Sequence, residues 1–155
     1  MKLQKSFIVL CAVFCVSSAG AATQIADPVK FVQAQYTHAE IADPDDIYSP
    51  RIAALFALDK KEAGTDVGRI DFSIWMDGQE GPITDAKVTG VSVDNAPDRE
   101  VVVAKFKNHG APREVHFYFE KIGGAWKLDD ARSFTGERWV LSLILKYGWT
   151  GDQPN

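Results

Sequence analysis

The sequence predicts an α+β domain in which a cone-like, bent antiparallel sheet of about four strands packs on N-terminal helices and on a C-terminal helix. Three observations predict it. Two early segments carry apolar residues at helical spacing, residues 83–131 follow a period of two, and a last helical pattern comes after them. An antiparallel sheet with one apolar and one polar face needs helices on its apolar side.

Each N-terminal helix is predicted to begin at a capping residue followed by proline. Asp27-Pro28 begins the first helix, which we expect to run to about His38. Ser49-Pro50 begins the second helix, and Gly64 ends it.

The strands follow from residue 83 onward. The apolar phase of the first strand slips at Gly90, which predicts a β-bulge there. Gly123-Gly124 predicts a two-residue hairpin turn, whose register places Phe117 opposite Asp130. The predicted core face carries Val101, Val103, Val115, Phe117, Phe119, Trp126 and Leu128. The predicted solvent face carries Phe106, Glu114, His116, Tyr118, Glu120, Lys127 and Asp129.

A closing helix is expected from about Glu137 to Tyr147. Its apolar stripe consists of Val140, Leu143, Ile144 and Tyr147, widened by Trp139. Gly148 is a natural helix stop. The predicted organisation is therefore a single domain over residues 23–149 and a flexible tail over 150–155.

The first twenty-two residues predict a secretory signal peptide. Lys2 and Lys5 precede an apolar run over 7–16, and the small residues Ala19-Gly20-Ala21 follow it. The alternative, a transmembrane anchor, needs roughly twenty apolar residues, and this run is too short. We therefore expect a periplasmic or secreted protein with no membrane anchor after signal cleavage.

Composition narrows the chemistry of the remaining chain. Cys11 and Cys15 both lie in the predicted signal, so we expect no disulfide, thiol nucleophile or cysteine metal site in the domain. The formal charge is −4, and loss of Lys2 and Lys5, with no acid lost, makes it −6. An acidic surface disfavours nucleic acid and anionic membranes as partners. We expect no cofactor and no metal.

Three stretches carry a resemblance to a known family. They are the opening helix with Phe31 and Tyr36, the segment IDFSIWMDGQE at 70–80, and the segment GAWKLDD at 124–130. In these stretches the chain resembles the bacterial envelope family called domain of unknown function 3828, which has the nuclear transport factor 2-like (cystatin-like) fold. The resemblance implies that fold and an envelope location, and it implies no reaction.

Asp130 is a candidate ligand-binding residue because the predicted register places its carboxylate on the core face. An ionised carboxylate there needs hydrogen bonds or a charge partner. Two interpretations stay open: a structural bond near the start of the closing helix, or a polar group at the mouth of the cone that fixes a ligand. Tyr36 is the one residue expected to form an acid–base pair with Asp130.

A second candidate group lies in residues 65–82, which predict a partly buried loop. Here Asp71, Asp77 and Glu80 surround Trp75. Acids beside an aromatic ring on a loop can bind a cation, a sugar or a peptide. The alternative is solvent-facing acids beside a tryptophan that belongs to the core. The three acids lack calcium-loop spacing, so they predict no metal site.

The histidines predict no metal site either, because His38, His109 and His116 share no ligand-like spacing. His116 falls on the predicted solvent face of the sheet, which is a candidate surface for a partner or a homodimer.

The function favoured by these patterns is a non-enzymatic binding or interaction module of the bacterial envelope, with an envelope protein or a small ligand as its partner. The absence of catalytic spacing, including any G-x-S-x-G nucleophile signal, favours it. One alternative is a small periplasmic enzyme that uses Asp130 and Tyr36 for acid–base chemistry. Another is an immunity-type inhibitor.

Overall fold

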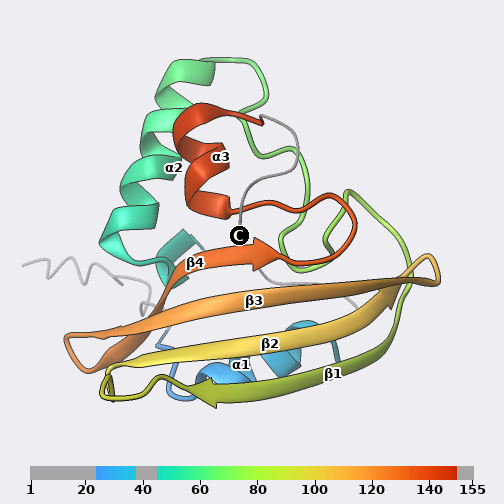
Figure 1. Ribbon diagram of the computed structural model, residues 1–155. Coiled ribbons are helices and arrows are strands. Elements are labelled where there is room, and N and C mark those ends of the chain that lie inside the picture. Colours follow the sequence, from blue (N-terminus) through green and yellow to red (C-terminus); the bar gives the residue numbers. More distant parts are fainter. Residues whose placement is uncertain (1–23, 38–44, 150–155) are drawn as a thin grey trace, which may run out of the picture.

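The computed structural model describes residues 24–37 and 45–149 (Figure 1). The predicted signal peptide, His38 and the predicted tail lie outside the described residues. The elements in chain order are α1 (Pro28–Gln35), η1 (Asp45–Ile47), α2 (Pro50–Ala63), β1 (Ile83–Ser92), β2 (Arg99–Asn108), β3 (Ala111–Ile122), β4 (Ala125–Ser133) and α3 (Leu141–Tyr147). No helix in the described part of the chain is long and apolar enough to cross a membrane.

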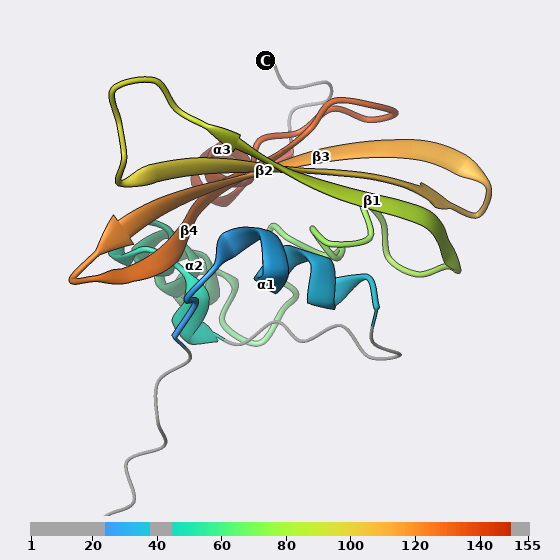
Figure 2. The same cartoon turned by 90° about the horizontal axis from the view of Figure 1, so that it is seen from below.

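The α+β class is confirmed. The four strands form one antiparallel sheet in the order β1-β2-β3-β4. Figure 2 shows α1 beneath the sheet, where it contacts β1 and β2. Helices α2 and α3 pack against each other at the β4 edge (Figure 1). The segment between α2 and β1 passes under the same face as α1 (Figure 2).

The predicted caps of the N-terminal helices are confirmed. The Asp27 side chain accepts a hydrogen bond from the Lys30 N–H, and the Ser49 side chain accepts one from the Ile52 N–H. Each cap satisfies a backbone donor that the first helical turn leaves unpaired. Gly64 ends α2 as predicted, and within the described residues α1 ends at Gln35.

The bulge of β1 was predicted at the wrong place. The register shift lies between Thr84 and Lys87, whereas Gly90 pairs in regular register with Val102. Gly90 is required for a different reason. A Cβ atom there would lie 2.7 Å from Val29 Cγ2 on α1. The glycine therefore lets the helix approach the strand closely.

The face assignment is right for β3 and wrong for β2. Val115, Phe117 and Phe119 are buried as predicted. On β2 the buried apolar residues are Val102, Ala104 and Phe106, whereas Val101 and Val103 are only partly buried. The sequence has three consecutive valines here, so the period of two does not fix which face they occupy. The pairing of Val102 with Phe117 does.

The predicted pairing of Phe117 with Asp130 is also wrong. The Gly123-Gly124 turn and the Phe119–Leu128 pair stand as expected, but the register then shifts. Phe117 pairs with Ala131, and Tyr118 pairs with Asp130, which leaves Asp129 as the extra residue of a bulge on β4. Asp130 therefore lies on the face of Tyr118 and not on that of Phe117.

The closing helix is shorter than predicted. Val140 is the N-cap and the helix begins at Leu141. Its buried residues are Leu141, Ile144 and Leu145, whereas Tyr147 is exposed. Trp139, expected on the helix stripe, is buried in the segment before the helix.

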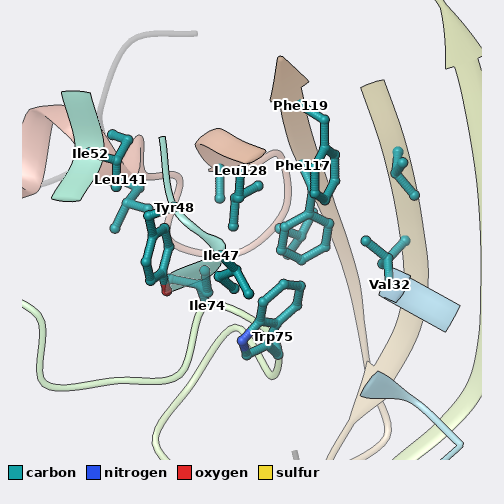
Figure 3. Packing of buried hydrophobic residues seen from close by; sticks show 14 of the residues in the cluster. Val32, Ile47, Tyr48, Ile52, Ile74, Trp75, Phe117, Phe119, Leu128 and Leu141 are labelled. Atoms are coloured by element: carbon teal, nitrogen blue, oxygen red, sulfur yellow. The ribbon is translucent and has the colours of Figure 1, made fainter. Parts of the chain in front are cut away.

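The hydrophobic core lies between the sheet and the layer formed by the helices and the segment before β1. Figure 3 shows Trp75 and Ile74 from that segment reaching toward Phe117 and Leu128 of the sheet. The Trp75 and Phe117 rings stack with centroids 4.7 Å apart. Burial of such large rings dominates the energetics of a core, so this segment is part of the folded structure.

Candidate functional site

The segment before β1 forms a tight loop over residues 73–78. The Ser73 N–H donates to the Gly78 carbonyl at 2.9 Å, and the Gly78 N–H donates back at 3.4 Å. Two outside side chains fasten the loop. Tyr36 Oη donates to the Trp75 carbonyl, and Asn108 Nδ2 donates to the Met76 carbonyl, each at 2.9 Å.

Asp77 is the polar centre of this loop. Its φ of +49° lies in the left-handed region, which aspartate tolerates better than most residues. The side chain is only 7% exposed. Trp139 Nε1 donates to Oδ1 at 2.6 Å, and Ser133 Oγ donates to Oδ2 at 3.0 Å. Arg113 Nε lies 3.5 Å from Oδ2. One carboxylate thus connects the loop to β3, β4 and the segment before α3.

Burial and the neighbours of Asp77 act on the pKa of its carboxyl in opposite directions. Burial raises the pKa of its carboxyl above the ordinary value, and the nearby charge of Glu137 adds to the rise. The hydrogen bonds from Trp139 and Ser133 and the charge of Arg113 favour the ionised form and offset part of that rise. The same carboxylate acts on Tyr36, whose hydroxyl pKa is raised by burial and by the charge of Asp77.

An open cleft of about 900 Å³ lies beside this carboxylate. Its lining residues come from the segment before β1, from β3 and from the segments on either side of α3. Figure 1 shows the chain segments before β1 and after β4 near α3. We call it the aromatic cleft and define it by its lining. The lining residues are Gly68, Arg69, Asp71, Phe72, Asp77, Gly78, Gln79, Arg113, Gly136, Glu137, Trp139 and Trp149.

Three aromatic rings form the apolar wall of the aromatic cleft. The Phe72 ring centroid lies 5.2 Å from that of Trp139 and 6.5 Å from that of Trp149. Trp139 is buried, whereas Trp149 is 44% exposed. A large exposed ring beside an open cleft is typical of a binding surface.

The arginines of the cleft are engaged with acids. Arg69 contacts Asp59 at 3.2 Å and Glu62 at 2.5 Å, and it also donates to the Leu145 carbonyl. Arg113 is paired with Asp77 as described above. Asp71 is exposed, and Gln79 Nε2 lies 3.5 Å from its Oδ2. The cleft thus offers carboxylates and one amide to a ligand more readily than it offers guanidinium groups.

The structure brings together two of the five predicted site residues. Asp71 and Asp77 both line the aromatic cleft. Trp75 is 1% exposed and belongs to the core, which agrees with the structural interpretation of this residue. Tyr36 lies beneath the loop, on the Trp75 carbonyl. Asp77 is not solvent-facing, so the structural interpretation of the acids does not hold for it.

Asp130 is a β4 residue whose side chain contacts the start of α3, and it does not line the cleft. Its Oδ1 accepts from the Ser142 and Ala131 N–H groups at 3.0 Å each, and its Oδ2 accepts from Ser142 Oγ at 2.8 Å. Arg51 lies 3.9 Å from Oδ2. These are the backbone bonds near the closing helix that the structural interpretation of Asp130 predicts.

Across the described ranges, no three His, Cys, Asp or Glu side chains are grouped so that they could hold a metal ion. His116 Nε2 lies 2.8 Å from Glu114 Oε1, and its ring packs on Phe134 with centroids 4.1 Å apart. It therefore belongs to a local cluster on the open face of the sheet.

Sequence reasoning missed three important cleft residues, namely Arg113, Trp139 and Trp149. The sequence predicts Trp139 on the stripe of the closing helix and assigns no role to Arg113 or Trp149. The one signal available was a tryptophan at each end of the closing helix, outside its periodic apolar positions.

Comparisons of the chain with protein families, with curated proteins and with solved structures found no match. The similarity to domain of unknown function 3828 therefore stays a resemblance.

Proposed function

We propose that this chain is a secreted binding module of the bacterial envelope whose ligand occupies the aromatic cleft. The observation that carries the proposal is the cleft itself. It combines an apolar wall of Phe72, Trp139 and Trp149 with a few polar groups that converge on it. This combination is the usual composition of a small-ligand site.

The proposed fold is nuclear transport factor 2-like. What supports it is the element order, with two helices before a four-stranded meander and one after it, and the position of α1 against one face of the sheet. The proposed envelope location is supported by the signal-like pattern of the first twenty-two residues, which lie outside the described part of the chain.

Binding is favoured over the acid–base alternative by the bonds of the two residues that would carry it. A general acid or base must reach the substrate within hydrogen-bond distance. The Tyr36 hydroxyl is bonded to the Trp75 carbonyl, and burial raises its pKa. Both oxygens of Asp130 accept bonds from the start of α3 or from β4.

The open face of the sheet is a second proposed surface, for a homodimer. Val91 is 48% exposed on β1, and Val101 and Val103 are partly buried beside it. Sedimentation of the secreted protein tests this proposal. If the protein sediments as a monomer at two concentrations that differ by about a hundredfold, the proposal is contradicted.

The four tryptophans provide a test of the cleft proposal. Trp139 and Trp149 line the cleft, whereas Trp75 is buried in the core and Trp126 lies on β4. The protein is labelled with ¹⁵N at the indole nitrogens and titrated with a diverse library of small compounds. We expect binders to shift the indole signals of Trp139 and Trp149 and to leave that of Trp126 in place. A library that shifts none of them, or Trp126 alone, would overturn the proposal.

A further inference from the structure

We infer that the aromatic cleft selects an organic cation, an ammonium or guanidinium group carried on an apolar body. This inference deepens the proposed function and rests on it. The charge balance of the cleft, the ion pairs of its arginines and the geometry of its rings support it.

The charge balance of the cleft is negative. Its lining holds three carboxylates, from Asp71, Asp77 and Glu137, against two guanidinium groups. One of those groups, Arg69, is shared with Asp59 and Glu62 from α2, which do not line the cleft. When Asp59 and Glu62 are included, the net charge around the cleft is more negative than the charge of the lining residues alone. A negative net charge attracts a cation into the cleft.

Both arginines of the cleft are already paired with carboxylates. Arg113 is held at Asp77, where its Nε is buried. Arg69 spends its NH1 and NH2 groups on Asp59, Glu62 and the Leu145 carbonyl. An anion that approached either arginine would face the carboxylates already paired with it and the exposed carboxylates of Asp71 and Glu137 in the same cleft.

The aromatic wall fits a cation with apolar substituents. Phe72 meets Trp149 edge to face at 82°, and Trp149 is 44% exposed. Cations bind over the faces of such rings, and tryptophan gives the strongest attraction. Asp71 and Glu137 are exposed on the same cleft, so they can neutralise a cation that the rings hold.

The test compares choline with 3,3-dimethyl-1-butanol, which has nearly the same shape and no charge. Binding to the secreted protein is followed by the indole signals of Trp139 and Trp149. We expect choline to bind about five- to thirtyfold more tightly than the neutral alcohol. N-acetyl-arginine amide, in a parallel titration, represents a side chain of a peptide ligand. A preference for it over choline would assign the cation to a peptide, and the reverse would assign it to a free small molecule.

Two variants test the role of the carboxylates. Asp71→Asn and Glu137→Gln are each expected to weaken binding of the cation about two- to fivefold and to leave the neutral alcohol unaffected. Asp94→Asn is the matched control, because it removes one exposed charge on the turn after β1 and does not touch the cleft. High salt is expected to weaken the cation alone, since the Debye length falls to about 3 Å at 1 M.

Equal affinity for choline and the neutral alcohol would overturn the inference, as would cation binding that survives both cleft variants. Failure of choline and of the arginine derivative to bind would also overturn it. The proposed function would still stand if other compounds shift the indole signals of Trp139 and Trp149. It would fail together with the inference only if no compound of any charge does so.

Discussion

Replacing Asp77 with alanine removes the one group that connects the cleft loop to three other parts of the fold. The Trp139 indole N–H, on a side chain 2% exposed, would be left without an acceptor, at a cost of about 1–3 kcal/mol. Arg113 would lose its carboxylate partner. A fully buried pair broken in this way costs about 3–5 kcal/mol, and the 27% exposure of the Arg113 side chain reduces this to about 1–2 kcal/mol.

Removal of the buried charge itself gives back part of that loss, because burial raises the pKa of Asp77 and so penalises its ionised form. We therefore expect Asp77→Ala to lower the free energy of unfolding by about 2–4 kcal/mol. Asp77→Asn keeps an acceptor for Trp139 and tolerates the left-handed φ of +49°. It is expected to cost about 1–2 kcal/mol.

The assay is urea unfolding at pH 7, followed by tryptophan fluorescence and by circular dichroism. Asp71→Ala is the matched control, because it removes an exposed carboxylate from the same cleft, and it is expected to cost less than about 0.5 kcal/mol. An Asp77→Ala variant as stable as this control would contradict the prediction, because the bonds to Trp139, Ser133 and Arg113 would then contribute nothing to the folded state.

The remaining predictions concern pH and packing. Because the folded-state pKa of Asp77 is raised, its contribution to stability is present below the ordinary carboxyl pKa and is lost as pH rises through the folded value. In urea titrations, the free energy of unfolding of the wild type should therefore rise relative to that of Asp77→Asn as the pH falls toward about 4. Asp129 behaves oppositely: burial alone would raise its pKa, but hydrogen bonds from Arg51 and Ser49 outweigh burial and lower it, so its contribution is present above the ordinary pKa and is lost as pH falls through the folded value. The Asp129→Asn penalty should hence shrink in acid, and a penalty independent of pH would contradict this. Gly90→Ala should cost about 1–3 kcal/mol by crowding Val29, and a Val29→Ala background should restore part of it; additive losses in the double-mutant cycle would exclude that contact.

Features set by local chemistry were predictable from the sequence. Asp27 and Ser49 cap helices because each side chain accepts a hydrogen bond from an N–H of the first turn, and the proline that follows has a φ suited to the first helical position. Gly123-Gly124 forms a tight turn because both positions adopt positive φ. These signals fix the order of elements and the α+β class.

Features set by contacts between distant segments were not predictable. The Asp129 bulge is held by Ser49 Oγ at 2.6 Å and by Arg51, about eighty residues away in sequence. The bulge moves Asp130 to the other face of β4, and no local sequence pattern predicts this change. The close approach of Val29 to Gly90 is of the same kind, because it depends on how α1 crosses β1.

Only the part of the candidate site that lies on the loop before β1 was predictable from the sequence. The acid–aromatic loop drew attention to Asp71 and Asp77, since acids beside an aromatic ring on a loop can bind a ligand. Arg113 on β3, Trp139 before α3 and Trp149 after α3 reach the same cleft only through the fold, and each follows the loop by 35 residues or more in the printed sequence. Arg113 and Trp139 contact the Asp77 carboxylate, and Trp149 contacts Phe72.

A crystal structure of the protein, grown with the tightest-binding compound from the indole titration, shows directly whether the aromatic cleft is the binding site. We expect density for that compound in the aromatic cleft, against Phe72 and Trp149 and within reach of the Asp71 carboxylate. A compound bound instead on the open face of the sheet, beside His116, with the cleft holding solvent alone, would contradict this expectation.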